Sequence, residues 1–456
     1  MKLRLAMVFL LAIAAAALVS ADEGELPKFG DALHGTQKYD DFERPEKCRQ
    51  CHIEIYYQWD QSWMSKAYDS PWDEIEYFEL AVAHSKKNPK FKPVADGCNG
   101  CHTPVAFMAG DTPPPRPSEN SRANESVSCD VCHTITGYNE SALFNFSYYV
   151  NPGRTKYGSR GGNNSPAHDL VKTDIHKAAK FCANCHNEKN PWGIWVKSTY
   201  NEWLEGPYSK EGVQCHECHM PKGEGRRALT DGKTYDDMRQ HLFHGAHIES
   251  KTRGAIDVVV HPNMGEVPAG EAVTFFAHVF NQKAGHKIPT GSVEDRLLYL
   301  HVEAIDSAGT VYHLPVDKKG FEGEEYTIAS KALAYQDFKE MMDLPAEWNG
   351  LPRDGNVPEG DRIFRMPYFD EQGNVTVAQW NTAKLGVDYR VGPREDKIET
   401  YTWEIPYEVA PGPVTITATL NYRLLVDSVA RFLKVPEMYY KDRLINEYST
   451  TIEVLP

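Results

Sequence analysis

Hydrophobic and polar residues alternate with a period of two in several stretches after about residue 255. The clearest runs are 273–279, 298–304, 401–405, 414–422 and 451–454. Successive side chains of a β-strand point to opposite faces, so this pattern predicts strands with one buried face. Turns rich in glycine and proline separate the runs. The second part of the chain is therefore predicted to form an antiparallel β-sandwich, with 451–454 at an edge.

The part of the chain before residue 255 has helical spacing of apolar residues, interrupted by loop-forming segments. Helices are predicted over residues 52–68, 72–85, 168–186 and 197–209. The proline run within 111–117 and the glycine-rich segment 160–166 are predicted to be loops. The fold class is thus multidomain, with a mostly α and loop N-terminal domain before the β-sandwich domain.

We place the boundary between these domains at residues 254 and 255, and a partly helical insertion into the sandwich at about 331–397. Residues 1–21 begin with Lys2 and Arg4, continue as an apolar run and end in small residues, which is typical of a secretory signal peptide. The run is short for a membrane span, although an uncleaved anchor helix stays an alternative. An N-terminal domain at 22–254, export to the periplasm or the cell exterior, and no membrane span after cleavage are predicted.

The motif Cys-x-x-Cys-His occurs five times and uses every cysteine of the chain. The cysteines are Cys48, Cys51, Cys98, Cys101, Cys129, Cys132, Cys182, Cys185, Cys215 and Cys218, and the histidines are His52, His102, His133, His186 and His219. Two thiols at this spacing can form thioethers to the vinyl groups of one haem, and the histidine supplies an axial nitrogen. Zinc sites or disulfides also use paired cysteines, but neither explains a histidine after every pair. Five covalently attached haem c groups are predicted, whose faces, packed by aromatic residues, form much of the N-terminal core.

The second axial ligand of each iron decides what such a protein can do. A second histidine saturates the iron and makes an electron relay, whereas an open position lets a small molecule bind and react. Six histidines outside the motifs are the preferred second ligands: His84, His168, His176, His241, His247 and His286. His34, His216 and His244 are weaker candidates, and His278, His301 and His313 are interpreted as structural residues of strands.

Each preferred histidine is chosen from its position in the sequence. His241 and His247 belong to the cluster HLFHGAH, and His84 ends a predicted helix before the second motif. His168 and His176 lie eight residues apart on the helix predicted before the fourth motif. His286 lies in the loop AGHKIPTG of the strand region, where it either completes a haem site and locks the two domains together or is a structural loop residue.

The formal net charge of −15 affects the choice of partners. A chain of this charge is repelled by nucleic acid and by anionic lipid, and it can be steered toward basic partners or mineral cations. Redox partner proteins or extracellular electron acceptors are therefore the expected partners, together with possible self-association. The alternative is that the charge serves solubility alone.

Several segments resemble the multihaem cytochrome c-554 group. They include CRQCHIEIYYQWDQSWMSKAY, CNGCHTPVAFMAGD, CDVCHTITG, FCANCH and YNEWLEGPYSKEGVQCHECHMP. That group is related to pentahaem nitrite reductases and octahaem hydroxylamine oxidoreductases, and the GHKIPTG loop with Arg296 resembles a β-sandwich appended to many exported multihaem cytochromes. The resemblance implies closely packed haems, alternately parallel and perpendicular, with mostly bis-histidine irons. The Cys-x-x-Cys-Lys motif of nitrite reductases is absent from this sequence.

Two functions follow from these observations. The first is an exported electron carrier that passes electrons along a row of closely spaced haems, as a conduit or a filament subunit. The alternative is a redox enzyme that acts on a small nitrogen or sulfur species at one haem with an open position. No catalytic residue is assigned, and whether the protein is an enzyme stays open, with electron transfer the preferred interpretation.

Overall fold

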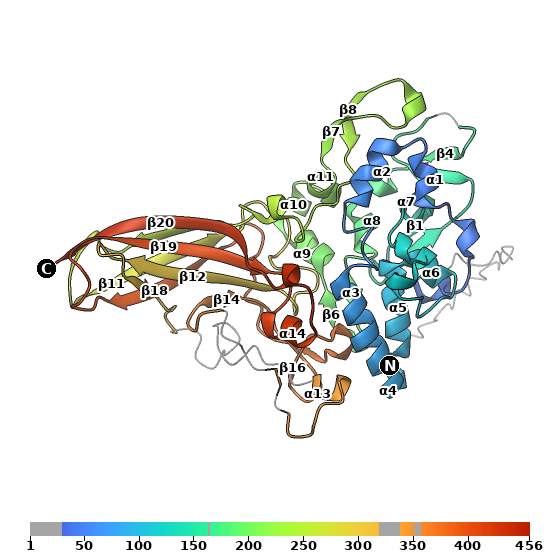
Figure 1. Ribbon diagram of the computed structural model, residues 1–456. Helices are drawn as coiled ribbons and strands as arrows, with labels where there is room; N and C mark the ends of the chain where they lie inside the picture. The colour runs from blue at the N-terminus through green and yellow to red at the C-terminus, as the bar shows by residue number, and fades with distance from the viewer. Residues whose placement is uncertain (1–29, 163–164, 319–337, 349, 352–356) are drawn as a thin grey trace, which may run out of the picture.

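The computed structural model describes residues 30–162, 165–318, 338–348, 350–351 and 357–456 (Figure 1). Helices and short strands of the N-terminal part gather at one end of the molecule, and long antiparallel strands extend from them to the C-terminus (Figure 1). The predicted fold class is confirmed. The proposed signal peptide at 1–21 lies outside the described residues. Among the helices of the described part, none has the length and apolar character required to cross a bilayer.

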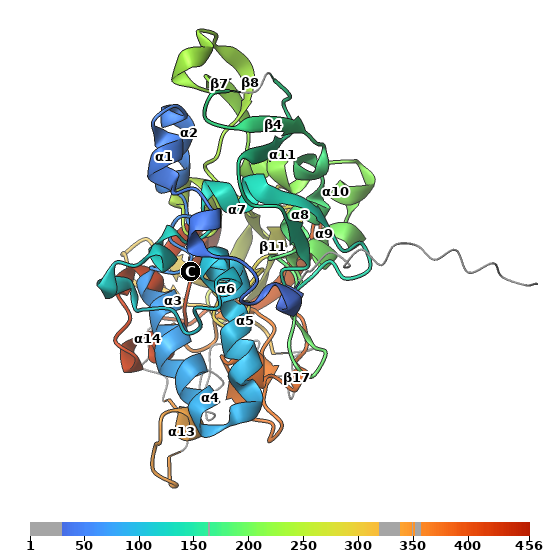
Figure 2. The ribbon, with the colours of Figure 1, turned by 90° about the vertical axis from the view of Figure 1, so that its right-hand side faces the viewer.

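The N-terminal part is built from short helices and two-stranded ladders (Figure 2). The helices are α1 Pro45–Arg49, α2 Ile53–Asp60, α3 Pro71–Ile75, α4 Ala83–Lys87, α5 Lys92–His102, α6 Pro104–Met108, α7 Cys129–Thr134, α8 Ala179–Ala183, α9 Thr199–Glu205, α10 Pro207–Lys210, α11 Cys215–His219 and α12 Glu249–Thr252. The strands are β1 Ile135–Tyr138, β2 Tyr148–Val150, β3 Thr155–Gly158, β4 Asp169–Lys172, β5 Glu188–Lys189, β6 Trp195–Lys197, β7 Lys222–Gly225 and β8 Tyr235–Arg239.

Two of the four predicted helices are present nearly as predicted. Residues 72–85 form α3, the π-helical segment Glu76–Val82 and α4, and residues 197–209 form α9 and α10. The helix predicted over 52–68 ends at Asp60.

The helix predicted over 168–186 is wrong in its first half. Residues Asp169–Lys172 form strand β4, the 3-10 turn Ile175–Lys177 follows, and only α8 is α-helical. Strand β4 pairs in parallel with β3, so its backbone groups bond across strands instead of within a helix. Pairing with a distant segment overrides the local helical spacing. His168 and His176 therefore do not share a helix.

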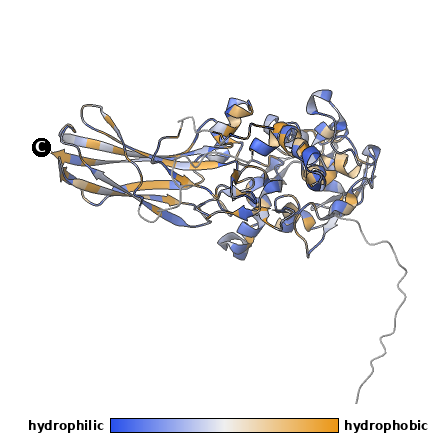
Figure 3. Cartoon of the chain, turned by 90° about the horizontal axis from the view of Figure 1, so that it is seen from below, coloured by the Kyte–Doolittle hydropathy of each residue, from blue (hydrophilic) through white to orange (hydrophobic). Residues whose placement is uncertain are grey.

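Two sheets form the β domain. The larger has the order β10-β20-β19-β12-β13 with β14 also on β12, and the smaller has the order β18-β11-β9. Their strands are β9 Asp257–Pro262, β10 Glu266–Pro268, β11 Ala272–Phe280, β12 Leu297–Ile305, β13 Val311–His313, β14 Arg362–Phe364, β18 Asp396–Glu404, β19 Gly412–Arg423 and β20 Arg443–Leu455. Apolar side chains of both sheets share one hydrophobic core, as alternation along the strands predicts. Hydrophobic and hydrophilic residues are interspersed along these long strands (Figure 3). Strand β20 is covered by the short parallel strand β10, so the C-terminal strand is not itself the edge.

The insertion predicted at 331–397 is only slightly helical in its described residues. It contains α13 Phe338–Met341, the 3-10 turn Gln379–Asn381, and a small sheet of β15 Tyr368–Phe369, β16 Val375–Thr376 and β17 Lys384–Leu385. Helix α14 Asp427–Phe432 follows later, between β19 and β20.

The helical region and the β region are packed directly against each other. Trp72, Leu80 and Phe91 of the helical region belong to the same hydrophobic cluster as the strand core. The indole nitrogen of Trp72 donates a hydrogen bond to the Asp295 carboxylate at 3.3 Å. The β region therefore packs against the helices that carry or adjoin the cysteine motifs.

Candidate haem sites

Each Cys-x-x-Cys-His motif lies on a short helix or at its end. Helices α7 and α11 begin at the first cysteine of a motif, whereas α5 ends at His102. Residues three apart lie on the same face of a helical turn, so both thiols of a motif can face one cofactor. All ten cysteines are free thiols, so the disulfide interpretation has no support in this structure.

Thiols of different motifs meet in three places. Cys48 lies within hydrogen-bonding reach of Cys129, Cys101 of Cys185, and Cys182 of Cys215. Cys132 is also close enough to Cys182 to interact electrostatically with it. In space, the third motif therefore lies between the first and the fourth. The second and the fifth motifs both lie next to the fourth.

Four of the five motif histidines donate their Nδ1 hydrogen to a backbone carbonyl. The pairs are His52 with Arg227 at 2.5 Å, His102 with Ala67 at 2.6 Å, His133 with Tyr157 at 2.7 Å and His219 with His244 at 2.7 Å. A carbonyl oxygen only accepts, so Nδ1 carries the hydrogen and the lone pair of the ring is on Nε2. This is how a second shell fixes the tautomer and the orientation of a metal-binding imidazole.

Burial keeps several of these rings neutral. Loss of hydration lowers the pKa of His133, and it lowers the pKa of His186 and of His219 to about 4. A neutral imidazole can bind a metal ion, whereas an imidazolium cannot. At neutral pH these nitrogens are available as ligands.

Three motif histidines face a second histidine at nearly the same separation. The ring centroids are 6.1 Å apart for His52 and His168, 6.4 Å for His133 and His241, and 6.3 Å for His219 and His286. The second ring of each pair also has its Nδ1 on a backbone carbonyl, of Asp169 at 3.2 Å, Arg239 at 3.0 Å and Lys287 at 2.9 Å, respectively. In all six rings the Nε2 atom is therefore the one left for a ligand bond.

These separations fit an iron between the two rings. A metal–imidazole bond is about 2.0–2.1 Å long, and the ring centre lies about 1.1 Å beyond the nitrogen, so two trans imidazoles have centroids roughly 6.3 Å apart. The first ring of each pair directly follows the second cysteine of its motif in the chain. The residues present thus suit a covalently attached haem with histidine on both faces.

The other candidate histidines lie in different surroundings. His176 hydrogen-bonds through Nε2 to the carbonyl of Cys132 at 3.0 Å, and burial lowers its pKa to about 4. The ring of His247 lies over Trp63 at 3.7 Å, and its buried Nδ1 has no hydrogen-bond partner among the described residues. His84 accepts a hydrogen bond at Nδ1 from the indole of Trp380, 3.0 Å away, and its Nε2 lies 3.8 Å from Glu340.

His176 also stacks on His133, with ring centroids 5.6 Å apart, but its Nε2 and not its Nδ1 is bonded to a carbonyl, so this pair differs from the three facing pairs. Among the described residues, His84 and His247 make no ring contact with a motif histidine. His244 takes part through its backbone carbonyl, which accepts from His219, and not through its ring. The carbonyls that orient the motif histidines were not found from the sequence. They belong to residues up to 175 positions away, and a backbone carbonyl carries no sequence signature.

A partly buried charged cluster adjoins the second and fourth motifs. Lys197 donates hydrogen bonds to Glu188 and to Gln379, both at 2.5 Å, and its charge acts on Cys98 and His186. The carboxylates of Glu76, Glu294 and Asp295 converge nearby. Burial raises the pKa of Asp295 to about 6, although Arg296 opposes the shift.

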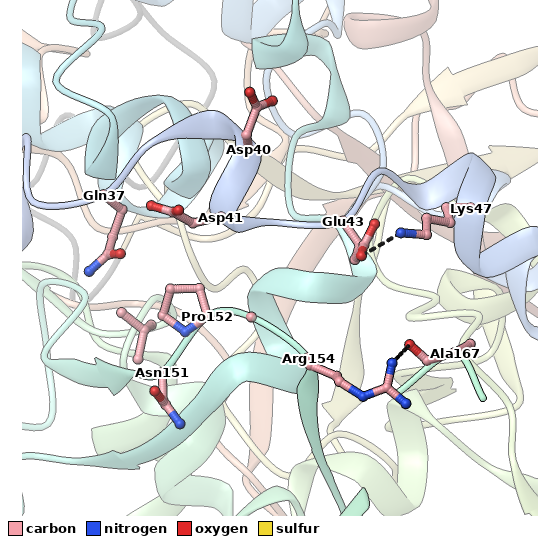
Figure 4. A pocket seen from close by; sticks show the side chains of 11 residues that line it. Gln37, Asp40, Asp41, Glu43, Lys47, Asn151, Pro152, Arg154 and Ala167 are labelled. Carbon is pink, nitrogen blue, oxygen red and sulfur yellow. Dashed lines mark hydrogen bonds and ion pairs between the residues drawn. The ribbon is translucent and has the colours of Figure 1, made fainter. Parts of the chain in front are cut away.

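A surface cavity of about 610 Å³ lies beside the first motif (Figure 4). Its lining includes the acidic side chains of Asp40, Asp41 and Glu43 and the basic side chains of Lys47 and Arg154. Glu43 and Lys47 form an ion pair at 2.6 Å on this wall. Lys47 directly precedes Cys48 and Ala167 directly precedes His168, so the cavity adjoins the first motif, although neither His52 nor His168 lines it.

Comparison with known proteins gives two informative matches. The family described as Cytochrome c554 and c-prime matches residues 47–134, which contain the first three motifs. The crystal structure of a penta-heme cytochrome c552 from Thermochromatium tepidum aligns over 91% of this chain and 100% of that chain, with 21% identity and a TM-score of 0.64. At this identity the likeness shows a common fold.

Two other aligned structures have TM-scores too low to indicate a common fold. A CARDB domain from Pyrococcus furiosus aligns over 45% of this chain and 92% of that chain, with 14% identity and a TM-score of 0.17. Spo0M from Bacillus subtilis aligns over 44% of this chain and 50% of that chain, with 12% identity and a TM-score of 0.16. No curated protein matches the chain. The family match over three motifs and the fold shared with a penta-heme cytochrome together support a multihaem c-type cytochrome that functions in electron transfer.

Proposed function

We propose that this chain binds five haem c groups and carries electrons along them. A haem iron, once bound, supplies a one-electron couple, and the protein sets its potential through axial ligands, hydrogen bonds and burial. The observation that carries the proposal is the set of three facing histidine pairs, in which all six Nδ1 atoms are bonded to carbonyls. Histidine on both faces favours electron transfer over binding of a small molecule.

We further propose that His286 brings the β region into the haem row. Its ring faces His219 of the fifth motif, and its loop is held by a hydrogen bond of 3.0 Å from the Asn281 amide to the His286 carbonyl. One iron would thereby be coordinated by residues from both regions. The boundary at 254 and 255 then separates two domains that cannot move apart without losing a ligand.

The contacts between thiols suggest the route of the electrons. The first and third motifs would form one closely spaced haem pair, and the fourth motif would connect it to the second and the fifth. Cys218 of the fifth motif is exposed, and the surface cavity adjoins the first motif, so these two motifs are the proposed entry and exit points. A row with two exposed ends suits a conduit and, by end-to-end contact, a filament subunit.

The place and partners of the protein follow from the sequence. An apolar run after Lys2 and Arg4 supports export, and the compartment of export is also where haem is attached to thiols in c-type maturation. The net charge of −15 supports basic redox proteins or extracellular acceptors as partners.

Two measurements on the purified protein test the proposal. Intact mass should exceed the peptide mass by five haem groups, and electron paramagnetic resonance of the oxidised protein should count at least three low-spin irons. A bare peptide mass would contradict haem attachment altogether. A high-spin iron that binds carbon monoxide or cyanide would instead favour the enzymatic alternative at that haem.

A further inference from the structure

Three side chains with metal-binding atoms meet on the outer face of the larger sheet, far from the cysteine motifs in sequence. Strand β12 pairs first with β14, where Leu300 lies opposite Arg362, and then with β13, where Glu303 lies opposite His313. His301 lies on β12 at the point where one edge partner replaces the other. Asp361 lies next to Arg362, at the start of β14. The register of the sheet thus brings His301, His313 and Asp361 together.

The two histidine side chains both contact one oxygen of the Asp361 carboxylate. The Oδ1 atom of Asp361 lies 3.0 Å from His301 Nδ1 and 2.8 Å from His313 Nε2. The two imidazole rings are nearly parallel, with an angle of 7° and centroids 5.1 Å apart. The Asp361 side chain is completely buried, whereas the His301 and His313 side chains are 23% and 32% exposed. The buried carboxylate is therefore covered by two imidazoles that point their nitrogens at the same place.

We propose that His301, His313 and Asp361 form a binding site for a divalent transition-metal ion, for which Zn²⁺ is the best match. Two imidazole nitrogens and one carboxylate oxygen are a common protein ligand set for zinc. Bonds of about 2.0–2.1 Å place neighbouring ligand atoms about 2.9–3.4 Å apart, depending on the angle at the metal. The two nitrogen–oxygen separations of 2.8 and 3.0 Å are near the lower limit of this range, and all three ligand atoms lie within 4.8 Å of one another.

The surroundings of His301 suit a ligand that binds through Nδ1. Its other nitrogen, Nε2, faces the Glu303 carboxylate at 3.6 Å. A carboxylate on the far side of a ligating imidazole holds the ring and makes its metal-binding nitrogen more basic. Glu303 would therefore be a positioning residue and not a ligand.

The ion would have a structural effect on the sheet. Strand β13 has only three residues and pairs with β12 alone, at the edge of the sheet. A metal bound by His313, His301 and Asp361 would connect this short edge strand to β12 and to the start of β14. Such a link stabilises the folded chain by an amount that rises with the logarithm of the free metal concentration above the dissociation constant.

The test measures Zn²⁺ binding to the haem-loaded protein after removal of metals with a chelator. Isothermal titration should detect a zinc site that D361N and H313A each weaken by 10-fold or more, because H313A removes a ligand nitrogen and D361N replaces the anionic carboxylate by a neutral amide. Anomalous scattering at the zinc absorption edge, from crystals of the zinc-loaded protein, should place the ion among the three residues. D361N and H313A change only side chains, so the backbone hydrogen bonds of the sheet stay intact.

The matched control is H278A. His278 also bonds a carboxylate through Nδ1, that of Asp396 at 2.8 Å, but it stacks on His261 and no third ligand was found there among the described residues. H278A should leave the affinity of the site unchanged. If the wild-type protein and D361N bind zinc equally, or if the zinc is found elsewhere, the three residues are a hydrogen-bonded triad only and the proposal is wrong.

Discussion

The residue on which most of the proposed haem arrangement depends is His286. The sequence left its role open between a haem ligand and a structural loop residue. The structure places its ring 6.3 Å from His219, with its Nδ1 on the carbonyl of Lys287. That geometry leaves Nε2 as the ring nitrogen available for a bond beside the fifth motif, which favours the role of a ligand.

Replacing His286 should therefore change one iron and leave the others unchanged. H286A should convert one low-spin signal to high spin in the electron paramagnetic resonance spectrum, because one axial nitrogen is lost. H286M should keep that iron low-spin and raise the potential of one haem in a redox titration, since a thioether ligand favours the reduced iron. H261A is the control, because His261 stacks on His278 away from the motifs. Unchanged spectra in both His286 variants would rule out ligation by this residue.

Asp388 provides a pH-dependent contribution to stability. Burial alone would raise its pKa, but hydrogen bonds and charges from Arg390 and Lys287 outweigh burial and lower the pKa to about 2. A lowered pKa means that the stabilisation is complete above the unfolded pKa of about 4 and is lost as the pH falls toward 2. The shift corresponds to roughly 2 kcal/mol.

We expect D388N to lower the free energy of unfolding by about 2 kcal/mol at pH 6 and by about half as much at pH 3. Denaturant unfolding at the two pH values measures this difference. D174N is the control, because the Asp174 side chain is 74% exposed and its bond to Lys177 is screened by water. A cost of D388N that does not change with pH would show that its carboxylate is not stabilised in the folded state.

At the scale of secondary structure, the motif helices are packed tightly around small residues. Gly100 lies within α5, between the two cysteines of the second motif. A Cβ atom at this position would lie 2.6 Å from the ring of Phe146, which belongs to a buried cluster with Phe107 and Val131. Gly97, one helical turn earlier, would meet the same ring at 3.7 Å, which is ordinary contact.

G100A should therefore destabilise the protein by about 1–3 kcal/mol, because the Phe146 ring must move inside a packed core. G97A should be neutral or stabilise by up to about 1 kcal/mol, because alanine favours the helix and no clash occurs. Thermal or denaturant unfolding of the two variants measures both values. Equal effects of the two substitutions would contradict the close packing of α5 on Phe146.

At the scale of the whole molecule, ion pairs join the helical region to the β region. Arg390, which follows β17, bonds Glu202 of α9 at 2.6 Å, and both side chains are almost fully buried. Arg394 bonds Glu211 at 2.5 Å, but both of these side chains are nearly half exposed. The two pairs cross the same boundary and differ in burial, but Arg390 also bonds Asp388, so the pairs are compared through their coupling energies.

Breaking the buried ion pair should lower the free energy of unfolding much more than breaking the exposed ion pair. R390M should destabilise the protein by about 3–5 kcal/mol because Glu202 is left buried and uncompensated. R394M should cost less than about 1 kcal/mol, since water screens the exposed pair. A double-mutant cycle with E202Q and E211Q, read by unfolding, gives the coupling energy of each pair. Similar coupling energies for the two pairs would indicate that the regions are not held together by the buried contact.

Local sequence was sufficient to predict covalently bound haem and most strands. A Cys-x-x-Cys-His motif needs only a few neighbouring residues to hold its haem, so its spacing is informative without any tertiary contact. Alternation along β11, β12 and β19 gave the buried face correctly, because period two is a property of the strand itself. The same local reasoning failed in the first half of 168–186, where residues with helical spacing form strand β4 because they pair with β3.

Long-range packing determined the contacts between residues that are distant in the sequence. The sequence could nominate His168, His241 and His286, but only the fold sets each of them opposite a particular motif histidine. Carbonyls that orient the motif rings, and the meeting of His301 with Asp361 across a change of edge strands, have no local sequence pattern. The physical reason is that a ligand set depends on distances between segments, which folding fixes through burial and sheet register and which spacing along the chain does not contain.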